Sequence, residues 1–162
     1  MEPIRIEDWR PEFRQQVIGL ILPIQTAEFS ITITAQQQPD LQDVRGFYQY
    51  GNGGFWLACH GKQVVGCIAL KDIGDGEGAL RKMFVAAPWR GREHGVAAAL
   101  LAHLLTHARE RKMRTLYLGT TAAFLAAHRF YEKHGFSLVE ADTLPESFPR
   151  MAVDSRFYRM AL

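Results

Sequence analysis

The stretch from Leu80 to Leu118 constrains the fold more than any other, because it reads as a strand, a basic loop, a long amphipathic helix and a second strand. This order predicts two parallel strands joined by one helix, a connection that is right-handed almost without exception. The loop holds Arg90, Gly91, Arg92 and Gly95, so tight backbone turns and fixed positive charge meet where the helix begins. Free N–H groups and the helix dipole already favour an anion at that end. The loop therefore predicts a phosphate site.

The segment that enters the helix excludes two common phosphate-binding motifs and fits a third. No Gly-Lys-Ser/Thr follows, as it would in a P-loop, and the G-x-G-x-x-G pattern of dinucleotide-binding folds is absent. Residues 92–97 instead resemble Arg/Gln-x-x-Gly-x-Gly/Ala, the pyrophosphate motif of the GNAT superfamily of acetyl-CoA-dependent N-acyltransferases. These residues are Arg92, Glu93, His94, Gly95, Val96 and Ala97. Phe130–Phe136 resembles the family's later F/L-Y-E-K-x-G-F signature, so the resemblance covers about residues 54–139.

The resemblance implies an α/β (α+β) fold with a mixed, mostly antiparallel central sheet. About seven strands and about four flanking helices are expected, with a splayed parallel strand pair that binds acetyl-CoA. A length of 162 residues fits the usual size of one domain. We therefore expect residues 1–162 to form a single GNAT N-acetyltransferase domain.

Local patterns predict the elements around this unit. A helix is expected from about His94 to Lys112, and a hairpin from Phe55–His60 and Gln63–Lys71. Glu28–Thr34 alternates like a strand or an extended loop. Asp72–Gly78 is acidic and rich in glycine, which predicts a turn before the central strand.

Cys59 and Cys67 are the only cysteines, and they flank the turn of the expected hairpin. In the expected register Cys59 faces Val64 and Cys67 faces Trp56, so no disulfide is predicted. Two buried thiols favour a reducing compartment, and neither a signal peptide nor an apolar run of membrane-spanning length is present. A net charge of +2 argues against nucleic acid as a partner. The expected protein is cytoplasmic, with no membrane or nucleic-acid partner.

The resemblance also assigns residues to the acetyl-CoA cosubstrate. It implies that Met83, Phe84 and Val85 lie against pantetheine, and that a backbone N–H near Phe84 or Val85 faces the thioester oxygen. Arg90 and Gly91 join residues 92–97 in the phosphate loop. Phe124 stands where the family usually has an Asn that contacts coenzyme A, so Thr120 or Thr121 is expected to make the polar contact instead.

Acetyl transfer needs an acid for the departing thiolate and a base for the incoming amine. The family motif implies that Tyr131 is the acid, and the alternative is a packed core aromatic. Ala79 holds the position where many members have a Glu base. Glu77, two residues earlier on the strand, and His128, one helical turn before Tyr131, remain the two candidates for the base.

No metal is expected. His103 and His107 are spaced i, i+4, but no Cys or carboxylate partner accompanies them.

The resemblance also implies that the segment before the hairpin, which varies most within the family, covers the acceptor pocket. Its residues Glu28, Phe29 and Tyr48 are therefore possible acceptor contacts, with an ordinary surface loop as the alternative.

These patterns together predict an acyltransferase that moves an acetyl group from acetyl-CoA to the primary amine of a small molecule by direct attack. Two alternatives stay open: a protein Lys or N-terminal acetyltransferase, and a non-catalytic acyl-CoA-binding module. A homodimer is a further hypothesis, since family members often pair and Phe148 and Phe157 are expected to be exposed aromatics. The identity of the acceptor does not follow from the sequence.

Overall fold

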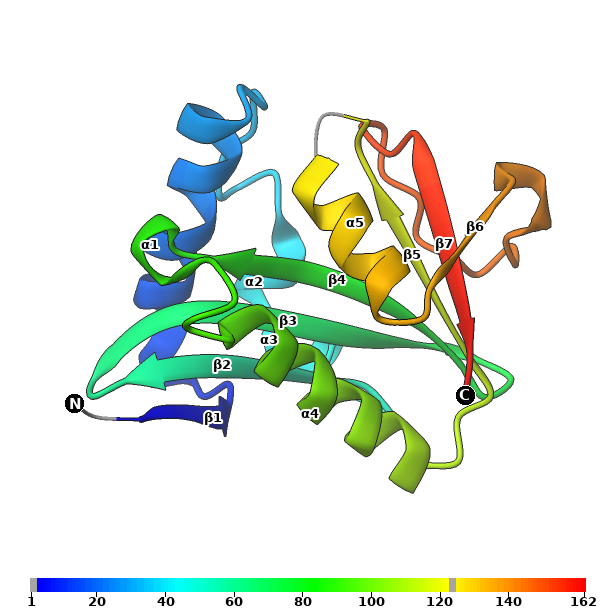
Figure 1. The fold of residues 1–162 in the computed structure, drawn as a ribbon, viewed down its shortest axis with the longest axis horizontal. Coiled ribbons are helices and arrows are strands. Elements are labelled where there is room, and N and C mark those ends of the chain that lie inside the picture. Colours follow the sequence, from blue (N-terminus) through cyan, green and yellow to red (C-terminus); the bar gives the residue numbers. More distant parts are fainter. Residues whose placement is uncertain (1–2, 123–124) are drawn as a thin grey trace.

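A seven-stranded sheet forms the centre of the computed structural model, which describes residues 3–122 and 125–162 (Figure 1). The strands are β1 (Ile4–Asp8), β2 (Gly54–His60), β3 (Gln63–Gly74), β4 (Glu77–Val85), β5 (Thr115–Thr120), β6 (Ser137–Val139) and β7 (Arg156–Ala161). Their order is β1-β2-β3-β4-β5-β7-β6, and of these neighbours only β4 and β5 run parallel. The mixed, mostly antiparallel sheet and its parallel central pair are confirmed.

Helices cover both faces of this sheet (Figure 1). They are α1 (Arg14–Pro23), α2 (Pro39–Gln42), α3 (Val44–Phe47), α4 (Val96–Glu110) and α5 (Leu125–Lys133). One apolar cluster joins α4 and α5 to the sheet, through residues such as Leu100, Leu116 and Phe136. A second cluster joins α1–α3 to the opposite face, through residues such as Ile21 and Phe55. Within the described residues, no helix has both the length and the apolar character that crossing a bilayer requires.

Helix α4 follows directly from its sequence. Leu100, Leu101, Leu104 and Ala108 recur at helical spacing, and all four are at most 1% exposed against the sheet. Burying each leucine side chain contributes about 2 kcal/mol, so this face fixes the position of the helix. The turn that precedes the helix is fixed with it.

The β2–β3 hairpin contains a bulge that the alternating pattern did not predict. Cys59 pairs with Val64 as expected, but the register shifts between Ala58 and Cys59. Cys67 therefore lies opposite Leu57 and not opposite Trp56. One extra residue on β3 is enough to displace every pairing beyond it. Both thiols are buried and free.

The β3–β4 connection is tighter than the turn expected over Asp72–Gly78. Asp75 and Gly76 form the turn with φ of 56° and 73°, and strands run up to it on both sides. An Asp-Gly pair with positive φ at both residues is the preferred two-residue hairpin turn, because its twist matches that of the strands. Glu77 is consequently a strand residue.

The segment after α1 differs from the strand alternative for Glu28–Thr34. A π-helical turn covers Ile24–Glu28, directly after Pro23, and no strand is assigned from Phe29 to Thr34. Pro23 has no N–H to donate to the carbonyl of Gly19, so the helix is weakened just before this turn, and π-helical turns are frequent at functional sites. The extended-loop alternative is the correct one for residues 29–34.

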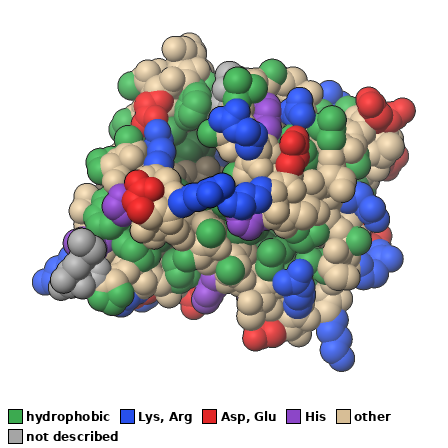
Figure 2. Space-filling view, in the orientation of Figure 1, with side chains coloured by type: hydrophobic (Ala, Val, Ile, Leu, Met, Phe, Trp, Pro, Cys, Tyr) green, Lys and Arg blue, Asp and Glu red, His purple; other side chains and the backbone are tan. Residues whose placement is uncertain are grey.

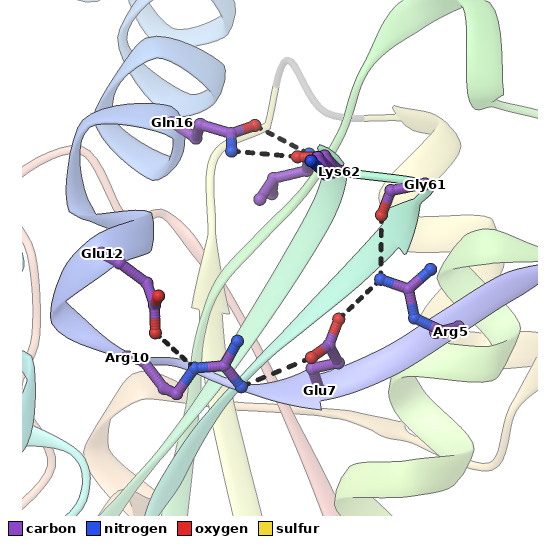
Figure 3. A network of polar contacts seen from close by, with 8 residues as sticks. Arg5, Glu7, Arg10, Glu12, Gln16, Gly61 and Lys62 are labelled. Carbon is purple, nitrogen blue, oxygen red and sulfur yellow. Dashed lines mark hydrogen bonds and ion pairs between the residues drawn. The ribbon is translucent and has the colours of Figure 1, made fainter.

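A chain of polar contacts ties β1 to α1 and to the β2–β3 turn (Figure 3). Its ion pairs alternate in sign along Arg5, Glu7, Arg10 and Glu12. Arg5 also donates to the carbonyl of Gly61, and Gln16 of α1 donates to that of Lys62. Exposed pairs of this kind contribute at most about 1 kcal/mol each, and here the charges balance locally. The cluster orients the edge strand, and its two arginines are matched by its two glutamates.

Candidate active site

Strands β4 and β5 are paired at one end and separate at the other. They pair through Glu77–Ala79 and Thr115–Tyr117, and the pairing stops there. Beyond that point Lys82 and Met83 of β4 lie opposite the single residue Ile68 of β3, with φ of 54° at Lys82. This is a β-bulge, which bends the strand and increases its local twist. The bulge carries the end of β4 away from β5.

A pocket lies at this separation and encloses about 860 Å³, its open mouth included. Ala127 and Tyr131 of α5 line one side, Gln25 and Ile31 line another, and residues from the 148–154 segment complete the wall. Figure 2 shows a hollow near the middle of the face that carries α4 and α5, with Lys and Arg side chains at its rim. The pocket thus joins elements from both faces of the sheet.

Tyr131 points its hydroxyl into this separation. The side chain is 7% exposed, and the hydroxyl donates to the sulfur of Met83 at 3.7 Å. Burial raises the pKa of Tyr131 above its ordinary value. The hydroxyl is therefore a proton donor at any pH near neutrality.

Four of the residues expected to contact coenzyme A line the pocket: Met83, Phe84, Thr120 and Thr121. Val85, the last residue of β4, lies outside the lining and offers its carbonyl to Arg90. Phe124 lies outside the described residues. The pocket therefore unites Tyr131 with the bulge of β4 and the end of β5.

The loop before α4 has the geometry of an anion-binding turn. Gly91 and Gly95 have φ of 108° and 64°, values that L side chains rarely adopt. Gly95 is the N-cap of α4, and no side chain caps the helix. The N–H groups of Val96 and Ala97 belong to its first turn, where the backbone has no partner within the helix.

Arg90 and Arg92, two residues apart in this loop, have different surroundings. Arg90 donates to Val85 and, through both terminal nitrogens, to the carboxylate of Glu28 at 2.6 and 3.1 Å. Arg92 is exposed and forms no ion pair within residues 3–122 and 125–162. Arg92 therefore carries the uncompensated charge at the helix start, while Glu28 is occupied as the partner of Arg90.

The other two loop residues are exposed and face neighbours within the loop. The carboxylate of Glu93 lies against Gly91, and the ring of His94 packs on Trp89 with centroids 5.3 Å apart. Neither side chain points toward the pocket between β4 and β5.

The two candidate bases do not reach this pocket. Glu77 lies at the paired end of β4 and accepts a hydrogen bond from the Tyr117 hydroxyl at 3.0 Å. His128 is 4% exposed, with its Nε2 2.7 Å from the carbonyl of Thr121. Neither Glu77 nor His128 therefore lines the pocket together with Tyr131.

Three charged residues that the sequence patterns did not assign to the site line the pocket: Arg81, Lys82 and Asp154. Lys82 is almost fully buried and lies 3.5 Å from Asp40. Burial lowers the pKa of Lys82, and Asp40 partly opposes this. Burial likewise raises the pKa of Asp154, which accepts a hydrogen bond from the backbone N–H of Met151. A strand bulge and a loop position have no clear sequence signal, so pattern alone could not find them.

Three aromatic expectations need correction. Tyr48 is fully buried and donates to Asp40, so it is a core residue and not part of a surface loop. Phe157 is 3% exposed, and its ring packs on that of Phe148, which lines the pocket. Both phenylalanines are used inside the fold, so they do not provide the exposed patch on which the homodimer hypothesis relied.

Comparisons with known proteins agree with this geometry. Residues 10–136 match the model of the acetyltransferase (GNAT) family. The chain is 34% identical to a GNAT-family acetyltransferase from Staphylococcus aureus Mu50, with a TM-score of 0.93 over 98% of each chain. It is 39% identical over 110 residues to the uncharacterized N-acetyltransferase YedL of Escherichia coli K12, covering 67% of this chain and 65% of YedL.

A further relative is the N-acetylaspartate synthetase of Danio rerio, 34% identical over 126 residues. The alignment covers 75% of this chain and 44% of that protein, so the chain spans less than two thirds of the length of these curated relatives. The fold, the separated strand pair and the family match agree, and the chain belongs to the GNAT family of acetyltransferases.

Proposed function

We propose that this protein is an N-acetyltransferase that transfers an acetyl group from acetyl-CoA to the primary amine of a small molecule. The observation that carries the proposal is the buried Tyr131 hydroxyl, which lies in the separated end of the β4–β5 pair. Acetyl-CoA carries the acetyl group as a thioester, and the amine nitrogen attacks the carbonyl carbon of this thioester. The uncapped start of α4 is suited to the phosphates of this cosubstrate, and the Tyr131 hydroxyl is suited to its sulfur.

The fit to coenzyme A is supported by the groups that β4 and α4 leave open. After Ala79, β4 no longer pairs with β5, so its backbone at Met83–Val85 offers an edge along which an extended amide chain can pair. The uncapped first turn of α4 offers N–H groups to a pyrophosphate, and Arg92 adds a free positive charge there. Arg90 shapes the loop through Glu28 and contributes less charge.

Tyr131 is the proposed acid. A C–N bond forms as the C–S bond breaks, the departing thiolate takes the Tyr131 proton, and the amine loses a proton to the surroundings. General acid catalysis of this kind contributes roughly 100-fold or more. A backbone N–H near Phe84 or Val85, aimed at the thioester oxygen, would lower the barrier by about 3 kcal/mol.

A small acceptor is favoured because the pocket is bounded by residues of both faces and by the 148–154 segment. The relationship to N-acetylaspartate synthetase adds support, since that protein's name describes an amine acceptor of amino-acid size. A protein acetyltransferase predicts turnover on Lys peptides instead, and an acyl-CoA-binding module predicts binding without turnover.

The test is thiol release from acetyl-CoA with amino acids, polyamines, aminoglycosides and Lys peptides, for the wild type and Tyr131→Phe. We expect turnover with one class of small amine, reduced about 100-fold in the variant. Acetyl-CoA binding without turnover on any amine would contradict the proposal. Turnover confined to peptides would replace the small acceptor with a protein.

A further inference from the structure

The bulge in β4 places two consecutive cations on the same face of the sheet. In a regular strand, neighbouring side chains point to opposite faces. Here the Arg81 guanidinium lies 6.0 Å from the Tyr48 ring, and Lys82 lies 3.5 Å from Asp40, to which the Tyr48 hydroxyl donates. Both cations therefore face the side covered by α1–α3, and both line the pocket.

Lys82 is already occupied. Its ammonium group donates to Gln38 and pairs with Asp40, and Gln38 exchanges two further hydrogen bonds with Gln25. This buried network holds Lys82 in place and leaves it little capacity for a ligand. Its charge is balanced by Asp40.

Arg81 is different, because no carboxylate lies within 4.0 Å of it among the described residues. Its Nη2 donates to the sulfur of Met151 at 3.1 Å, and the cation lies near the rings of Phe47 and Tyr48. A thioether is a weak acceptor, so a carboxylate would readily displace it. Arg81 is therefore a cation in the pocket wall that has no strong hydrogen-bond acceptor, such as a carboxylate, among the described residues.

Asp154 supplies an opposite charge near Arg81. It lines the same pocket, packs against Gly119 at the end of β5 and accepts from the N–H of Met151. The positive charge of Arg81 acts on the Asp154 carboxyl, yet the two side chains do not form an ion pair. The pocket wall therefore carries two opposite charges, both beside Met151, that do not form an ion pair with each other.

We propose that Arg81 binds the carboxylate of the acceptor, and that the acceptor is an α-amino acid whose amino group lies toward Asp154. The inference rests on the proposed function and narrows its acceptor class. A guanidinium can bind a carboxylate through two parallel N–H···O bonds, which fixes both position and orientation. An α-amino acid carries its amine one carbon from that carboxylate, so holding one end presents the other. Polyamines lack the carboxylate and would bring cations toward Arg81.

The experiment compares the twenty L-amino acids with their α-carboxamides and with putrescine, in thiol release from acetyl-CoA. Wild type is compared with Arg81→Gln, with Arg81→Lys, and with Arg159→Gln, an exposed cation on β7. We expect the wild type to prefer an amino acid over its carboxamide by at least tenfold. In Arg81→Gln, kcat/KM for the amino acid should fall roughly 10- to 100-fold, mainly through KM. For the carboxamide, kcat/KM should change no more than about twofold in the same variant.

The controls separate binding from folding. Arg81→Lys keeps the charge but loses the planar guanidinium group, so its kcat/KM for the amino acid should lie between those of the wild type and Arg81→Gln. Arg159→Gln should match the wild type, and unchanged coenzyme A affinity in Arg81→Gln would exclude a general folding defect. Equal turnover of acids, carboxamides and putrescine would overturn the inference, as would equal losses on acid and carboxamide in Arg81→Gln.

Failure of the proposed function gives a different result. If no amine releases thiol, calorimetry of the same amino acids with the coenzyme A-saturated protein decides the matter. Amino-acid binding that disappears in Arg81→Gln would support the carboxylate site without acetyl transfer. Absence of binding in the wild type would overturn it.

Discussion

The two ends of the β4–β5 pair are built from the same strands and yet have opposite properties. At the paired end, Ala79 and Leu116 are fully buried and the ladder is continuous. At the separated end, the wall carries Arg81, Lys82 and the Tyr131 hydroxyl. At the paired end the ladder closes over apolar core residues, whereas the separated end exposes backbone and charge inside the fold.

A polar network, and not packing alone, holds the two strands apart at the separated end. Lys82 has φ of 54° without being a glycine, a conformation that costs about 1 kcal/mol or more. Its side chain is held by Asp40 and Gln38, and its carbonyl accepts from the Cys67 thiol at 3.1 Å. These contacts offset the strain, so changes to them should affect the separated end selectively.

The largest effect is expected from Asp40→Ala. This change leaves the Lys82 ammonium and the Tyr48 hydroxyl without their buried partner, and breaking such a pair costs about 3 to 5 kcal/mol. Urea unfolding at pH 7 would measure the loss. The double variant Asp40→Ala/Lys82→Met should recover much of it, because no unpaired charge remains. A single variant within about 1 kcal/mol of wild type would show that the network does not support the bulge.

A matched pair of tyrosines gives the next effect. Tyr131→Phe removes the proposed acid from the separated end, so kcat should fall about 100-fold with a loss of stability below about 1 kcal/mol. Tyr117→Phe removes the hydrogen bond to Glu77 at the paired end, and should cost about 1 kcal/mol of stability with kcat unchanged. Thiol release and thermal unfolding measure the two quantities. Similar kcat values in both variants would end the contrast between the two ends.

A smaller difference is expected between Arg90 and Arg92, the two arginines of the loop before α4, in their effects on coenzyme A affinity. Arg92→Gln removes a free cation beside the α4 N-terminus and should weaken coenzyme A binding about five- to tenfold at low salt. Arg90→Gln should weaken it less than about twofold, because Glu28 already neutralises that charge. Calorimetry with coenzyme A at two salt concentrations would measure both, with a smaller difference expected at high salt. The reverse order would move the phosphate contact to Arg90.

These contrasts also mark how far the sequence could predict the site. The spacing of Leu100, Leu101 and Leu104 predicted α4, and the glycines before it predicted the tight turn at its N-terminus. Tyr131 followed from a local motif. The two bulges could not be predicted from the sequence. A strand with one extra residue has the same pattern as a regular strand, and the bulge is defined only by the pairing with the neighbouring strand. That is why Cys67 was paired one residue off and why Arg81 and Lys82 were not recognised as pocket residues.

The smallest effect tests the bulge from its β3 side. Burial raises the pKa of the Cys67 thiol from 9.0 to about 12. In the unfolded chain the thiol ionises from about pH 9, whereas in the folded protein it stays protonated. Its contribution to stability is therefore complete below pH 9 and is lost as the pH rises toward 12. Between pH 7 and 9.5 this amounts to about 0.8 kcal/mol.

Cys67→Ser removes this titration but keeps a donor for the Lys82 carbonyl. Urea unfolding of both proteins at pH 7 and pH 9.5 should therefore show a smaller alkaline loss in the variant, by about 0.8 kcal/mol. Cys59 is present in both proteins and cancels in the difference. An equal alkaline loss would mean that water reaches Cys67 at the bulge. The separated end would then be open on its β3 side as well, unlike the closed ladder at Ala79.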